Sequence, residues 1–90
     1  MQVNKENTLD FATLKETKKQ LELNDLSDLA SEIERILLKN RVKNTEYFLI
    51  DFCPPQIEII LSMLGYLKKE NKNQDYIKIF DKWNSLPDYR

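Results

Sequence analysis

The chain has 90 residues, of which 41% are hydrophobic and 32% charged, so it is too apolar for a disordered chain and long enough for one folded domain. Its 14 basic and 15 acidic residues give a formal net charge of −1, which excludes an overall basic footprint for nucleic acid. A single glycine disfavours an all-β fold, whose tight turns need glycine, and we therefore expect an all-α fold, a compact bundle of about four helices.

The N-terminal part of the chain predicts a tail followed by a helix. Residues 1–8 are polar and are expected to be flexible, whereas residues 9–90 form a single helical domain. Asp10 is a suitable N-cap for the first helix, and Leu9 and Leu14 have the spacing of a hydrophobic staple around it.

The second helix has the most regular pattern. Asn24 and Asp25 follow the expected end of the first helix at Leu23 and supply a turn and a cap. Hydrophobic residues then recur at helical spacing: Leu26, Leu29, Ala30, Ile33, Ile36 and Leu37. Acidic residues early in this segment and basic residues late in it match the helix dipole.

Two later segments allow more than one interpretation. Residues 46–52 are rich in strand formers, yet Asn44 or Thr45 could cap a short helix there. Residues 76–80 alternate like a strand, although Tyr76, Ile79, Phe80 and Trp83 also have helical spacing. A small α/β fold with strands near 46–52 and 76–80 is therefore the alternative to the helical bundle.

The third helix carries more hydrophobic surface than the others. Pro55 can occupy its first turn, and it should continue to Lys69 or Asn71. Eight of the eleven residues from Ile57 to Leu67 are large and apolar. A helix that is apolar on most of its circumference must be buried on most of it, and a small bundle surrounds no helix completely. A fourth helix follows, capped by Asn73 or Asp75 and stopped by Leu86-Pro87.

The residue types that catalysis most often uses are scarce. No histidine, one cysteine and one glycine exclude histidine-based triads, the usual zinc sites and glycine-rich phosphate loops. We expect no enzyme activity, no cofactor, no metal and no small-molecule substrate. Cys53, between Phe52 and Pro54, should pack in the core, and Asp51 should either point outward or pair with a base of a partner.

The expected function is therefore non-catalytic protein binding, by a small adaptor, inhibitor or regulatory subunit whose partner is a second copy or a foreign chain. The expected contact residues are Met63, Tyr66, Phe80 and Trp83, because aromatic residues and Met are enriched at interface centres. The alternative is a small nucleic-acid-binding regulator that uses a basic cluster of Arg35, Lys39, Arg41 and Lys43. The unpaired cysteine, the lack of an apolar leader and the lack of a membrane-length apolar run predict a cytoplasmic protein.

Overall fold

The computed structural model describes residues 7–39, 46–71 and 74–86. In this part of the chain the helices are α1 (Phe11–Leu23), α2 (Ser27–Lys39), α3 (Pro54–Asn71) and α4 (Gln74–Asn84), and the strands are β1 (Thr8–Asp10) and β2 (Tyr47–Leu49). The small all-α bundle is therefore confirmed, with one short two-stranded sheet added to it.

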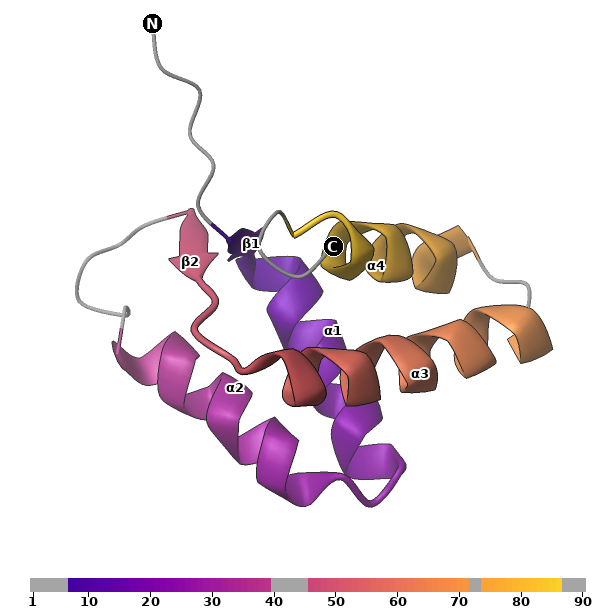
Figure 1. Cartoon of the computed structure of the whole chain (residues 1–90), viewed down its shortest axis with the longest axis horizontal. Coiled ribbons are helices and arrows are strands. Elements are labelled where there is room, and N and C mark those ends of the chain that lie inside the picture. The colour runs from indigo at the N-terminus through magenta and orange to yellow at the C-terminus, as the bar shows by residue number, and fades with distance from the viewer. Residues whose placement is uncertain (1–6, 40–45, 72–73, 87–90) are drawn as a thin grey trace, which may run out of the picture.

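The helices form two hairpins that the sheet holds together. The most extensive helix contacts are those of α1 with α2 and of α3 with α4 (Figure 1). Helix α1 also contacts α4, and β1, immediately before α1, pairs with β2, immediately before α3. Both connections therefore join the first hairpin to the second.

Helix α1 begins where the capping pattern predicts. The carboxylate of Asp10 accepts hydrogen bonds from the backbone N–H of Thr13 (3.2 Å) and from its hydroxyl (2.7 Å). Leu9 and Leu14, the two members of the predicted staple, are both buried. Thr17, two turns into this helix, is fully buried as well.

The sheet resolves the ambiguity of residues 46–52 and shortens the expected tail. β1 and β2 are antiparallel, with Leu9 opposite Phe48, and both of these side chains are buried. The pairing continues to Asn7, whose carbonyl accepts a 2.7 Å hydrogen bond from the N–H of Ile50. Asn7 and Thr8 are thus part of the fold, and only residues 1–6 of the expected tail lie outside the described residues.

The alternative strand at residues 76–80 is wrong, because this segment is part of α4. Ile79 and Trp83, about one helical turn apart, are the buried residues of this helix. The expected helix stop at Leu86 is close to the observed end at Asn84, whereas Asp75 lies inside the first turn and is not the cap. Asn73 and Pro87 lie outside the described residues.

The structure places Trp83 in the core and Cys53 at the surface, the opposite of what the sequence suggested. Trp83 is fully buried and its indole N–H donates a 2.8 Å hydrogen bond to the hydroxyl of Thr17. Its ring stacks on Phe52 at a centroid distance of 6.2 Å, so Trp83 is a core residue. The prediction that Cys53 packs in the core is wrong, since its side chain is exposed at the N-terminus of α3.

None of the helices in the described part of the chain is long and apolar enough to cross a membrane.

Candidate functional site

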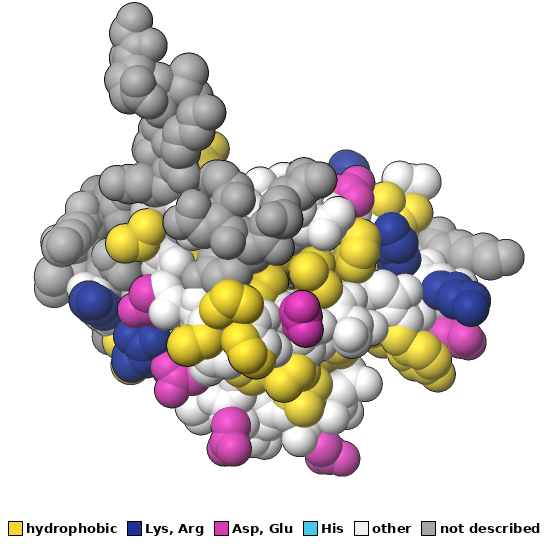
Figure 2. All heavy atoms as spheres, in the orientation of Figure 1, with side chains coloured by type: hydrophobic (Ala, Val, Ile, Leu, Met, Phe, Trp, Pro, Cys, Tyr) yellow, Lys and Arg dark blue, Asp and Glu magenta, His cyan; other side chains and the backbone are white. Residues whose placement is uncertain are grey.

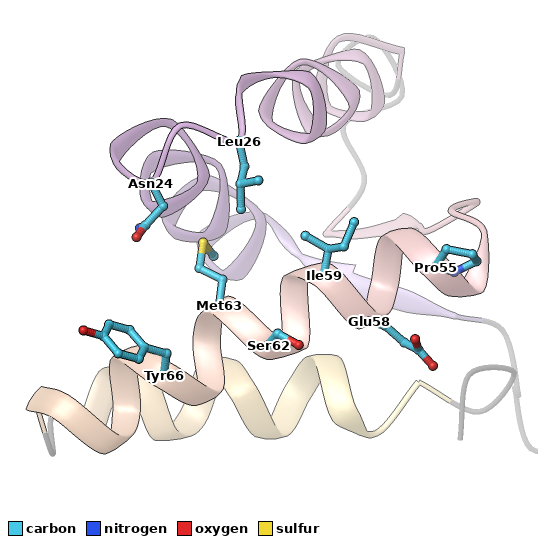
Figure 3. A pocket seen from close by; sticks show the side chains of 8 residues that line it. All are labelled: Asn24, Leu26, Pro55, Glu58, Ile59, Ser62, Met63 and Tyr66. Atoms are coloured by element: carbon cyan, nitrogen blue, oxygen red, sulfur yellow. The ribbon is translucent and has the colours of Figure 1, made fainter.

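A shallow groove runs between the outer face of α3 and the turn that joins α1 to α2. Residues from both hairpins line it: Asn24, Leu26, Pro55, Glu58, Ile59, Ser62, Met63 and Tyr66. Ile59 and Met63 point from α3 toward Leu26 across the groove, and Tyr66 stands at one end of it (Figure 3). We call this site the α3 groove.

The start of α3 is fixed by local chemistry. Its first two residues are prolines, which lack a backbone N–H. The loss costs little here, because the N–H groups of the first turn of a helix have no acceptor within the helix. The side-chain oxygen of Gln56 accepts a 2.8 Å hydrogen bond from the backbone N–H of Cys53, which is one half of a capping box. This cap sets the register that places Pro55, Ile59, Ser62 and Tyr66 on one face of the helix, at spacings of three and four residues.

The opposite wall of the groove is a helix C-terminal motif. The N–H of Leu26 donates to the carbonyl of Leu21 (2.8 Å) and the N–H of Asp25 donates to the carbonyl of Glu22 (3.3 Å), which is the Schellman pattern. This motif needs a left-handed residue, and Asp25, with φ of 62°, occupies the position where glycine is most frequent. The motif turns Leu26 back toward Leu21 and thereby presents it to the groove.

Helix α3 is buried on one face and open on the other. Ile57, Ile60 and Leu64 are at most 1% exposed, and they belong to the shared core. On the outer face, Ile59 is 45% exposed and Tyr66 is 61% exposed. The fold therefore shelters part of the hydrophobic surface of this helix and leaves the rest along the α3 groove.

The four predicted contact residues are divided between the groove and the core. Tyr66 lines the groove and is exposed, and Met63 lines its floor with 8% of its surface exposed. Phe80 is partly buried against the core and lies under the ammonium group of Lys68, 3.9 Å from the ring centroid. Trp83 is inside the core and does not line the groove, so in this structure its side chain is not accessible to a partner.

The groove residues that the sequence did not single out as contacts are Asn24, Leu26, Pro55, Glu58, Ile59 and Ser62. The spacing of Ile59 and Tyr66, seven residues apart, indicates a shared face. However, residues 57–67 are apolar almost all round, and the sequence alone does not say which face is turned outward.

The predicted basic cluster is only partly within the described residues, and its first member is engaged. The guanidinium of Arg35 pairs with Glu32 at 2.9 Å and with Asp51 at 3.1 Å. Asp51 is exposed and pairs with this base of its own chain, and the hydrogen bonds from Arg35 lower the pKa of the Asp51 carboxyl. Lys39 is exposed at the end of α2, and Arg41 and Lys43 lie outside the described residues.

A second hollow, between α1 and α4, has more charged residues among its described lining than the α3 groove. Two lysines and three acidic residues are among its lining residues: Asp10, Glu16, Asp75, Lys78 and Lys82. The ammonium group of Lys82 lies 3.0 Å from a carboxylate oxygen of Asp10. Partial burial raises the pKa of Asp10, but hydrogen bonds from Thr13 and Lys82 outweigh it and lower the pKa to about 2. This ion pair links the N-cap of α1 to α4, so the charges of Asp10 and Lys82 are structural contacts between the two hairpins.

Among the described residues, no group of three or more cysteine, aspartate and glutamate side chains could hold a metal ion. Comparisons of the chain with family models, with curated proteins and with solved structures found no match.

Proposed function

We propose that this protein is a non-catalytic protein-binding module, a small adaptor, inhibitor or regulatory subunit, and that its α3 groove receives a segment of the partner chain. The observation that carries the proposal is the exposure of Ile59 and Tyr66 on either side of the small Ser62, beside a wall formed by Leu26. A small residue between two large ones offers a recess for a side chain of a partner.

The energetics favour covering this groove. Fully burying a large hydrophobic side chain contributes roughly 1.5–3 kcal/mol, and about half of Ile59 and more than half of Tyr66 remain exposed. Covering the rest of both side chains would then contribute on the order of 1 kcal/mol each. Tyr and Met are also among the residues enriched at the centres of interfaces.

Binding of nucleic acid has less support. Arg35, the first member of the basic cluster, is held between two carboxylates and would have to leave them in order to contact a phosphate. The proposal includes a cytoplasmic location, which the exposed free thiol of Cys53 supports, because a reducing compartment protects such a thiol from oxidation.

Site-specific photo-crosslinking in the native host tests the proposal. A photoreactive phenylalanine analogue is placed at Ser62, inside the groove, and in a matched strain at Leu38, a half-exposed residue of α2 outside it. We expect a discrete cross-linked partner from position 62 and not from position 38, and we expect Tyr66→Asp to abolish it. Identical products from both positions, or a product that persists with Tyr66→Asp, would refute the proposal.

A further inference from the structure

The charge around the α3 groove is one-sided. Among the residues that the structure describes, Glu58 is the only charged one that lines it, and no lysine or arginine does. Asp25 lies in the turn between Asn24 and Leu26, both lining residues, and Asp28 lies in the first turn of α2 just beyond. Figure 2 shows acidic side chains beside the hydrophobic ones on the central and lower part of this face, with the basic side chains toward its two sides.

Several acidic residues elsewhere in the molecule are held in ion pairs. Asp10 is paired with Lys82, Glu34 with Lys18, and Asp51 with Arg35, at 3.0, 3.6 and 3.1 Å respectively. In the part of the chain that the structure describes, Glu58, Asp25 and Asp28 have no ion-pair partner.

The bases nearest along α3 do not compensate for them. Lys69, one turn beyond Tyr66, is followed directly by the acidic Glu70. Lys68 lies over the ring of Phe80, on the side of α3 that faces α4. The groove is therefore apolar along its floor and negative along its rim.

The lining on the α3 side has the length of a short helix contact. The residues from Pro55 to Tyr66 span eleven helical steps, about 16 Å or three turns. Ile59 and Tyr66 form ridges with a gap at Ser62, and a second helix can place one large side chain in such a gap.

Resting on the proposed function, we propose that the occupant of the α3 groove is an amphipathic helix of a foreign protein, with apolar residues on one face and lysine or arginine along its flanks. The apolar face covers Ile59, Met63 and Tyr66, and the flanking bases meet Glu58, Asp25 and Asp28. Such complementarity sets which partner binds and how fast, besides adding to affinity.

The same charges disfavour other occupants. The phosphates of nucleic acid and of an anionic membrane surface are repelled by the three carboxylates. A second copy would bring two acidic rims together, and no described residue of either groove lining is a lysine or an arginine.

The inference is tested with two synthetic helical peptides of about fourteen residues, enough for three to four turns. Both carry leucines at the same three- and four-residue spacing, and their flanks are all lysine in one and all glutamate in the other. Each is titrated into the full-length protein while backbone amide NMR signals are followed. We expect the lysine peptide to shift the signals of Ile59, Ser62 and Tyr66, to bind at least about tenfold more tightly than the glutamate peptide, and to weaken with added salt.

Charge-reversed variants separate this inference from the proposed function. Glu58→Lys combined with Asp28→Lys should weaken the lysine peptide and strengthen the glutamate peptide, while Asp81→Lys, at an exposed position of α4, should change neither. If the charge reversal has no effect, or if neither peptide binds in the groove while the cross-link from Ser62 persists, the basic helix is the wrong occupant and the groove still binds protein. If that cross-link is also missing, the proposed function fails with it.

Discussion

The hydrogen bond between Trp83 and Thr17 joins the two hairpins inside the core, and it gives the sharpest test of the fold. The Thr17 hydroxyl accepts from the indole N–H at 2.8 Å and donates to the carbonyl of Thr13 at 2.7 Å, and both Thr17 and Trp83 are fully buried. Thr17→Val keeps the shape of the side chain but removes the acceptor. A buried N–H left without a partner costs about 1–3 kcal/mol. With a urea m-value of about 1–2 kcal/mol per molar for a small domain, the unfolding midpoint should fall by roughly 1 M.

A double-mutant cycle assigns this loss to the hydrogen bond. Trp83→Phe removes the indole N–H, so in that background Thr17→Val should cost less than about 0.5 kcal/mol. All four proteins are unfolded in urea and followed by far-UV circular dichroism, since Trp83 is the only tryptophan and its fluorescence is lost in two of them. An equal cost of Thr17→Val in both backgrounds would show that the hydrogen bond contributes nothing and would refute the reasoning.

Three further predictions concern single residues. Because the pKa of Asp10 falls from 3.8 to about 2 on folding, its ionised form contributes stability that is complete above about pH 5 and is lost toward about pH 2. Asp10→Asn keeps a capping residue but cannot ionise. In urea titrations at these two pH values, the fall in the free energy of unfolding on acidification should therefore be roughly 1–2 kcal/mol smaller in this variant than in the native protein. Gly65→Ala should raise the free energy of unfolding by about 0.5–1 kcal/mol, because alanine favours helix and its Cβ would meet Phe80 at 3.5 Å, an ordinary contact; a loss of stability in urea would contradict this. The thiol of Cys53 should react fully with a thiol reagent in the native protein, and protection until denaturant is added would show that it is buried.

Local signals predicted most of the helical structure. The carboxylate of Asp10, the prolines at the start of α3 and the regular stripe of α2 act over one or two turns, and each helix is found close to its expected bounds. Asp25 could also have been recognised, since aspartate is one of the few residues other than glycine that tolerate a left-handed conformation.

The burial of Trp83, one of the four expected contact residues, could not be predicted for a different reason. Trp83 and Tyr66 are both large aromatic residues on amphipathic segments, and nothing within a few residues of either distinguishes a core side chain from an exposed one. Trp83 is buried because Thr17, sixty-six residues earlier, offers a hydroxyl to its indole and Phe52 stacks on its ring. Tyr66 is exposed because no element of the described chain covers that end of the α3 groove.

The sequence by itself determined where the helices begin and end, because capping and hydrophobic periodicity depend on neighbours only a few residues away. Only the tertiary structure decided that Thr8–Asp10 pairs with Tyr47–Leu49, since a three-residue strand carries too little local preference to reveal a partner almost forty residues distant. It also decided which side of α3 faces outward. That helix is apolar nearly all round, so its orientation follows from which surfaces α1, α2 and α4 present to it, and the α3 groove is what they leave uncovered.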